Sequence, residues 1–269
     1  MRSLNYGGGV QSTALLVLAA QGAIDVDLAI FANTGDDSED PGTIEYMAQV
    51  ARPFAAQHGI DLVEVTATIG GEPDTILGKI NRTKRSEVIP VRSREQGVPL
   101  SRSCTVSFKL EVIGKELRRR GAGPDNPATV MLGISADESS RSGRAAKEWE
   151  RLAYPLLGLG CDLPRGWDRP IMRSDCEVII RNAGLPVPPK SSCWFCPFTS
   201  VERWRERKRT RPDLFERACQ LEAQISEKAR KPRYLTRFGR PLAEVVQDEQ
   251  LVLDLDSELD SCTGGMCAT

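Results

Sequence analysis

The chain has 269 residues, of which 40% are hydrophobic and 27% are charged, and its net charge is −1. This composition is typical of one large globular α/β domain with a small appendage, and it excludes a globally basic nucleic-acid-binding surface. No apolar run is long enough to span a membrane and no signal peptide is expected, so the sequence predicts a cytoplasmic protein. In that compartment its eight cysteines favour metal binding or redox chemistry over disulfides.

The first predicted strand runs into a glycine-rich turn, and an apolar helix follows at once. The turn reads Tyr6-Gly7-Gly8-Gly9-Val10-Gln11-Ser12-Thr13. Glycines let a backbone approach a phosphate closely, and the free N–H groups at a helix start attract anions. The spacing matches neither the lysine-containing phosphate loop nor the G-x-G-x-x-G fingerprint. By itself the turn predicts either an anion site or a tight connection without a ligand.

Strand-like and helix-like segments alternate through the first half of the chain. Further strands are expected over 28–32, 61–65 and 128–134, and helices over about 43–58 and 105–120. This alternation predicts an α/β fold with a doubly wound, mostly parallel sheet. Residues 68–101 lack clean periodicity and are rich in basic side chains.

Beyond residue 155 proline, glycine and cysteine become frequent, and helices are expected over 200–210 and 212–229. We therefore expect two regions. Residues 1–155 would form a nucleotide-binding α/β domain, and residues 156–269 a cysteine-rich, helical C-terminal region with a flexible tail.

Three polar loops follow predicted strands of the sheet. They are the glycine-rich turn, the segment Asn33-Thr34-Gly35, and the segment from Gly133 to Arg141. In a doubly wound sheet, ligands bind beyond the carboxyl ends of the strands, where such loops meet. Each loop alone is consistent with an ordinary turn, but the three together predict one binding site.

These segments resemble those of the adenine nucleotide alpha-hydrolase, or PP-loop, superfamily, and especially its phosphoadenylyl-sulfate reductase-like ATP pyrophosphatases. The glycine-rich turn is similar to the family's S-G-G-x-D-S loop, with Gly7 in place of the serine and Gln11 in place of the aspartate. Residues 31–37 are similar to F-A-D-T-G-x-E, residues 102–109 to R-x-C-T-x-x-x-K, and residues 133–141 to G-I-R-x-x-E-S-x-x-R. The resemblance covers roughly residues 4–220.

The resemblance implies binding of ATP with Mg²⁺. The implied nucleotide-binding residues are Tyr6, Gly7, Gly8, Gly9, Gln11, Ser12, Thr13, Asn33, Thr34, Gly35 and Gly133. Lys109 and Arg141 would supply positive charge as catalytic residues. The acidic group missing at position 11 would be replaced by Asp36, Asp37 or Asp137.

A C-x-x-C motif is formed by Cys193 and Cys196. Its spacing alone fits half of a zinc site, a redox disulfide or part of an iron–sulfur cluster. The resemblance to iron–sulfur adenylyl-sulfate reductases favours a [4Fe-4S] cluster that also uses Cys104, where that family has a Cys-Cys pair. Cys176 is the candidate for the fourth ligand. Without it the cluster would keep an open iron, as in the iron–sulfur ATP pyrophosphatases that thiolate tRNA or DNA.

Two further cysteines, Cys262 and Cys267, lie in the C-terminal tail. They are either inert or act as a mobile sulfur carrier or redox nucleophile, although the reductases' terminal E-C-G-x-H motif is absent. Basic residues within 79–102 and 203–211 are either solvated or contact a nucleic-acid backbone.

The sequence thus predicts an ATP pyrophosphatase that adenylates a substrate for iron–sulfur-dependent sulfur incorporation into nucleic acid, either DNA or tRNA. The expected partners are a cysteine desulfurase as sulfur donor, the nucleic acid itself and other subunits of a modification complex. One alternative is a sulfonucleotide reductase that produces sulfite. Another is a zinc-stabilised nucleotide-binding subunit without catalysis.

Overall fold

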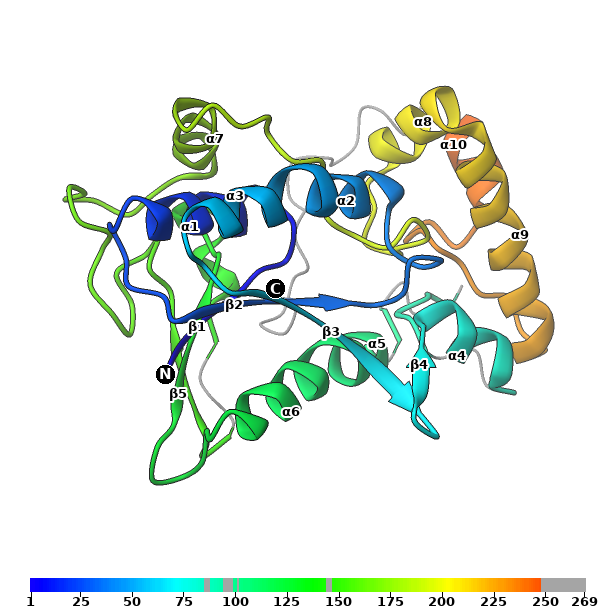
Figure 1. Cartoon of the computed structure of the whole chain (residues 1–269). Helices are drawn as coiled ribbons and strands as arrows, with labels where there is room; N and C mark the ends of the chain where they lie inside the picture. The colour runs from blue at the N-terminus through cyan, green and yellow to red at the C-terminus, as the bar shows by residue number, and fades with distance from the viewer. Residues whose placement is uncertain (85–87, 94–98, 101, 144–146, 248–269) are drawn as a thin grey trace.

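The computed structural model describes residues 1–84, 88–93, 99–100, 102–143 and 147–247. A six-stranded sheet with the order β4-β3-β2-β1-β5-β6 forms the centre of this part of the chain (Figure 1). The strands are β1 (Arg2–Asn5), β2 (Leu28–Asn33), β3 (Leu62–Ile69), β4 (Glu72–Asp74), β5 (Ala128–Leu132) and β6 (Glu150–Ala153). Neighbouring strands pair in parallel except β3 and β4, which are antiparallel. The expected α/β fold with a mostly parallel sheet is confirmed.

Helices cover both faces of the sheet (Figure 1). One face carries α1 (Val10–Ala20), the continuous run of α2 (Pro41–Tyr46), η1 (Met47–Ala51) and α3 (Arg52–Gln57), and α7 (Arg173–Asn182). The other face carries the run of α5 (Ser103–Thr105), η2 (Val106–Leu110) and α6 (Glu111–Arg119).

Strand β2 is an almost uninterrupted apolar run because both of its faces are buried. All of its residues are buried. Phe31 packs in the core cluster that contains α1, whereas Leu28 and Ile30 pack in the cluster that contains α6. A parallel strand with helices on both sides has no solvent face and therefore needs no polar positions.

The C-terminal helices build a third core cluster. They are α8 (Val201–Thr210), α9 (Pro212–Ala229) and α10 (Leu242–Gln247). At their centre the fully buried Trp204 meets Phe215 edge-on, with 6.4 Å between the ring centroids. The same cluster includes Phe108 and residues of α4 (Ile76–Arg82), so this helical region packs directly against segments from the first half of the chain.

The expected strands over 28–32, 61–65 and 128–134 and the C-terminal helices over 200–210 and 212–229 are confirmed, with small shifts of their ends. The helices expected over 43–58 and 105–120 also form, but each contains a π-helical turn, η1 or η2. Pro53 follows η1 closely, and a proline lacks the N–H group that an α-helical turn would use there. The irregular segment 68–101 contains β4 and α4, which the sequence did not predict. In the described residues no helix combines the length and the apolar composition needed to cross a membrane.

The loop that carries the C-x-x-C motif is anchored to the loop after β2. The backbone N–H of Asp40 donates to the carbonyl of Ser192 at 2.9 Å, and that of Trp194 donates to the carbonyl of Ser38 at 3.1 Å. These bonds form a short antiparallel bridge that fixes Cys193 beside the sheet. The position of the cysteine loop is therefore set by β2 and the turn that follows it.

Asp40→Ala should lower the free energy of unfolding, because the Asp40 carboxylate serves two partners. It caps α2 by accepting the N–H of Gly42 at 3.0 Å, and it pairs with the largely buried Arg207 of α8 at 2.7 Å. Losing the cap and leaving a guanidinium without its carboxylate should together cost about 2–4 kcal/mol. Urea unfolding measures the change.

Asp40→Asn is the matched control, since an amide oxygen still caps α2 while the charge is lost. We expect an intermediate loss of stability for Asp40→Asn. Unchanged stability of Asp40→Ala would show that this anchor is not needed.

Candidate functional site

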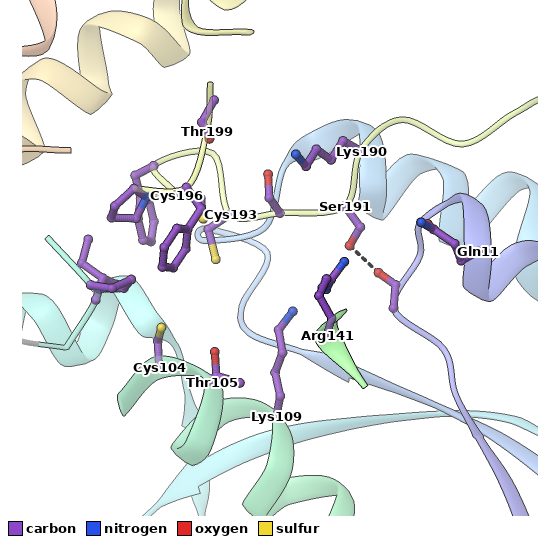
Figure 2. A pocket seen from close by; sticks show the side chains of 18 of the residues that line it. Gln11, Cys104, Thr105, Lys109, Arg141, Lys190, Ser191, Cys193, Cys196 and Thr199 are labelled. Atoms are coloured by element: carbon purple, nitrogen blue, oxygen red, sulfur yellow. Dashed lines mark hydrogen bonds between the residues drawn. The ribbon is translucent and has the colours of Figure 1, made fainter. Parts of the chain in front are cut away.

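The glycine-rich turn, the cysteine loop and the start of the α5–α6 run line one cavity of about 180 Å³. The predicted site residues on its wall are Gly7, Gly9, Gln11, Cys104, Lys109, Gly133, Arg141, Cys193 and Cys196 (Figure 2). The cavity lies beyond the carboxyl ends of β1 and β5. Because the chain builds β2 and β3 on one side of β1 and then crosses to β5 on the other, this is the switch point of the sheet, where ligands bind in doubly wound folds.

Glycines shape the turn after β1. Gly8 has a φ of +74°, and a Cβ atom there would lie 2.9 Å from the side chain of Thr43. The Ser12 hydroxyl donates to the carbonyl of Gly9 at 3.0 Å and accepts its N–H at 3.2 Å. Gly133, at the end of β5, passes so close that a Cβ atom would lie 2.9 Å from the Ser12 nitrogen. The conformation of the turn is therefore fixed by Gly8, Ser12 and Gly133. Gly9 lines the cavity.

Tyr6 and Thr13, two residues expected to bind the nucleotide, use their hydroxyl groups inside the protein. The buried hydroxyls of Tyr6 and Thr13 share a hydrogen bond of 3.0 Å, and burial raises the pKa of Tyr6 above its usual range. Neither residue lines the main cavity. Tyr6 instead lines a smaller hollow with Gly7 and Lys109.

Several polar side chains of the loop after β2 bond within the loop itself. Asn33 donates to Asp36 at 2.8 Å and accepts the N–H of Gly35 at 2.8 Å, and Thr34 donates to the buried Glu39 at 2.7 Å. None of Asn33, Thr34 and Gly35 is on the wall of the main cavity. Their observed role is to shape the loop on which the cysteine segment is anchored.

Gln11 is the centre of a polar network at the cavity wall. Its amide nitrogen donates to Glu138 at 3.1 Å and to Ser135 at 3.3 Å, and its amide oxygen accepts from Arg173 at 3.2 Å. An ionised aspartate at this position has no donor and would repel Glu138. Glutamine at position 11 is therefore compatible with an acidic side chain opposite the turn.

Glu138 is the acidic side chain that reaches the cavity. Of the residues expected to replace the missing aspartate, Asp36 accepts from Asn33, Asp37 accepts from Thr75, and Asp137 accepts the N–H of Arg173. None of these three lines the cavity, whereas Glu138 does and also pairs with Arg141. Of these four acidic residues, only Glu138 therefore brings a carboxylate to the wall of the cavity.

Positive charge dominates the described wall of the cavity. Lys109, Arg141, Arg173 and Lys190 line it together with the single acidic Glu138. Figure 2 shows Lys109 and Arg141 directed into the space between the glycine-rich turn and the cysteine loop. Lys109 comes from the π-helical turn η2, a kind of distortion that occurs frequently at functional sites. Such a wall suits a polyphosphate.

Three partly exposed cysteines line the other end of the same cavity. The sulfur atoms of Cys104 and Cys193 point toward each other, and Cys196 lies beside Cys193 (Figure 2). Burial raises the pKa of the Cys193 thiol well above its usual range, and the nearby Glu39 adds to the shift. Apolar side chains, including Phe195, complete this end of the wall.

The arrangement of these thiols bears on which metal group they fit. Within the described ranges, no three His, Cys, Asp or Glu side chains are close enough to hold one metal ion. Thiolates around one zinc ion lie about 3.8 Å apart, as bonds of about 2.3 Å in a tetrahedron require. A four-iron cluster binds each thiolate through a different iron, so it suits cysteines spread around a wider space. The three cysteines at this end of the cavity supply the thiolate ligands that a zinc ion and an iron–sulfur cluster both use.

The remaining cysteines are not part of this group. Cys176 is fully buried in α7, in the core cluster that also contains α1, and burial raises its pKa to about 12. It is absent from the described cavity wall, as are Cys161 and Cys219. The predicted fourth ligand is therefore not assembled with the other three. Cys262 and Cys267 lie outside the described residues.

Several residues of the site were not predicted from the sequence. Lys190 and Ser191 directly precede the cysteine loop, and Ser191 donates to the carbonyl of Gly7, which ties that loop to the glycine-rich turn (Figure 2). Their position next to the C-x-x-C motif was the available signal. Arg173 carried no such signal, because it reaches the cavity only through the packing of α7 on α1.

Comparisons of the chain with protein-family models, with curated proteins and with solved structures gave no significant match.

Gly9→Val should abolish ATP binding and leave the fold intact. The backbone of Gly9 is extended, and a Cβ atom there would meet only Ser191 at an ordinary 3.8 Å, so the added methyl groups would mainly occupy cavity space. Calorimetric titration with ATP and a thermal unfolding curve test the two parts of this prediction. Gly123→Val, in an open loop, is the control expected to bind normally. Normal ATP affinity of Gly9→Val would exclude the turn as the phosphate site.

Cys104→Ser, Cys193→Ser and Cys196→Ser should each lose iron from anaerobically purified protein, because each removes one thiolate anchor. Cys176→Ala and Cys219→Ser should keep the iron content and the visible absorbance of the parent protein. Iron analysis and absorbance spectra measure the outcome. A parent protein with one zinc ion and no iron would contradict the cluster assignment.

Proposed function

We propose that this protein is a PP-loop ATP pyrophosphatase of the phosphoadenylyl-sulfate reductase-like type. It adenylates an acceptor so that sulfur can replace one of the acceptor's oxygen atoms. The observation that carries this proposal is that a glycine-rich turn, a cationic wall and three cysteines share one cavity. A nucleotide site alone would explain the first two features, and a structural metal site alone would explain the third.

The nucleotide half of the proposal is supported by the position of the turn. It follows β1 at the switch point of the sheet and leads into the N-terminus of α1, where backbone N–H groups favour anions. Lys109 and Arg141 add charge on the opposite wall. Mg²⁺ binds proteins through one or two carboxylates together with substrate phosphates, and Glu138, which lines the cavity, would be such a carboxylate.

The first chemical step would be attack of an acceptor oxygen on the α-phosphorus of ATP. A bond forms between that oxygen and phosphorus, and the bond to pyrophosphate breaks. Lys109 and Arg141 would stabilise the negative charge that develops on the departing pyrophosphate. The product is an adenylated acceptor, in which a poor leaving group has been converted into AMP.

The second step would be displacement of AMP by a sulfur nucleophile, which leaves sulfur where the acceptor had oxygen. A cysteine desulfurase is the proposed source of this sulfur, which it carries as a persulfide; two electrons from a thiol reductant would release that sulfur as sulfide, and DNA or tRNA is the proposed acceptor. Cys104, Cys193 and Cys196 would hold a [4Fe-4S] cluster, which supplies an iron atom able to bind sulfide. The apolar residues around them would keep water from competing for the adenylated acceptor.

Release of pyrophosphate and AMP from ATP, in the presence of DNA or tRNA and of a sulfide source, tests this function. Lys109→Gln should slow pyrophosphate release by about 100-fold, the effect expected for removing one group that stabilises charge in the transition state. Lys115→Gln, on the exposed side of α6, removes the same charge away from the cavity and should be normal.

Absence of pyrophosphate release from the parent protein with both acceptors would contradict the proposed function. Production of sulfite from adenylyl sulfate would instead identify the protein as a sulfonucleotide reductase.

A further inference from the structure

A second cavity, of about 50 Å³, adjoins the first. The two share residues 197–199, which directly follow Cys196. A water molecule needs about 10–15 Å³ of such space, so the second cavity has room for a small oxyanion. Its polar and aromatic wall includes Arg92, Phe198, Thr236, Arg237 and Phe238.

Two arginines, Arg92 and Arg237, line this cavity, and a third, Arg102, is close to it on the ring of Phe198. Arg102 and Arg92 lie over the ring of Phe198, at 4.6 Å and 6.0 Å from its centroid, and Arg237 lies over Phe238 at 5.2 Å. Burial lowers the pKa of Arg92, and the like charges of Arg237 and Arg102 lower it further. No acidic side chain is found on the wall formed by the described residues. Several positive charges gathered at one cavity favour the binding of an anion there.

An unsatisfied hydroxyl is a second, independent feature of the cavity. Thr236 is 4% exposed, and its Oγ1 atom has no hydrogen-bond partner in the described structure. Leaving a buried polar atom without a partner is costly, and such atoms in native proteins call for an explanation. A hydroxyl beside arginines is suited to donate a hydrogen bond to a bound oxyanion.

The surrounding fold holds this site in place. Arg92 and Tyr234 exchange two backbone hydrogen bonds, of 2.9 Å and 3.0 Å, which join the basic segment before α5 to the segment after α9. The buried Glu222 of α9 then accepts the N–H groups of Leu235 and Leu242, at 2.7 Å and 2.8 Å. Thr236, Arg237 and Phe238 lie between these two fixed points. The site is thus formed before any ligand arrives.

We propose that this second cavity, the arginine site, binds a phosphate group of the sulfur acceptor. The inference rests on the proposed function and specifies how its acceptor is held. Guanidinium groups bind phosphate through paired hydrogen bonds, and the neighbouring Phe198 and Phe238 rings suit the bases of a single strand. Because Phe198 lines both cavities, a phosphate in the arginine site places the adjoining part of the acceptor at the cysteines.

A phosphodiester of nucleic acid is the favoured source of this phosphate, and a mononucleotide with a terminal phosphate is the other. Binding of a single-stranded DNA oligonucleotide and of adenosine 3′,5′-bisphosphate should be measured over a range of salt concentrations. Arg237→Gln should weaken oligonucleotide binding about 10-fold and reduce the slope of log affinity against log salt by about 1. Thr236→Val keeps the charge and should weaken binding about 3–10-fold, as the loss of one net hydrogen bond does.

Lys231→Gln is the matched control, because it removes one charge from the exposed part of the same segment. It should change oligonucleotide affinity less than 2-fold, as a distant solvated charge does. Binding of the bisphosphate but not of the oligonucleotide would keep the phosphate site and assign it to a mononucleotide acceptor. Equal binding of both ligands by Arg237→Gln, Thr236→Val and the parent protein would overturn the inference. Loss of oligonucleotide binding in Arg237→Gln without any pyrophosphate release from the parent would support the site and contradict the proposed function.

Discussion

The short backbone bridge between residues 38–40 and 192–194 is the constraint on which the candidate site depends. It joins the loop after β2 to a loop from the C-terminal region, and it places Cys193 at the carboxyl edge of the sheet. The ion pair of Asp40 with Arg207 and the bond from the Trp194 ring to the carbonyl of Asp37 reinforce the same contact. Each bond is modest, but together they bring the cysteines and the glycine-rich turn to one cavity.

The parts of the fold that could be predicted are those whose signal is local. The apolar run of β2 and the glycine-rich turn report a buried strand and a strand-to-helix connection directly. Short elements such as β4 and α10 lack a repeating pattern. Strand β4 forms by pairing with β3, and α10 forms because Leu242 and Val246 pack in the core cluster of the C-terminal helices. The π-helical turns were missed for a related reason, since their residues still follow an approximately helical period.

Motifs identified the site residues, but they did not give the directions of the side chains. The cysteines of the C-x-x-C motif and Lys109 reach the cavity as expected, whereas Ser12 and Thr13 turn inward and hold the turn. A hydroxyl in a phosphate-loop motif can serve either the ligand or the loop, and only the three-dimensional structure distinguishes these roles. The position of the carboxylate at the cavity likewise could be found only from the three-dimensional structure. With glutamine at position 11, the carboxylate at the cavity is that of Glu138, held by the Gln11 amide.

The shared wall between the two cavities links chemistry with recognition. Cys196 and Phe198 are two residues apart, so a thiol of the proposed cluster and a ring of the arginine site belong to the same short loop. An acceptor that places its phosphate among the arginines can extend only a short distance to the cysteines. The distance from the bound phosphate to the cysteines, and not the identity of any base, would then determine which atom of the acceptor reacts. In the proposed arrangement positive charge would supply affinity, while the loop that carries both residues would set the position at which sulfur is transferred.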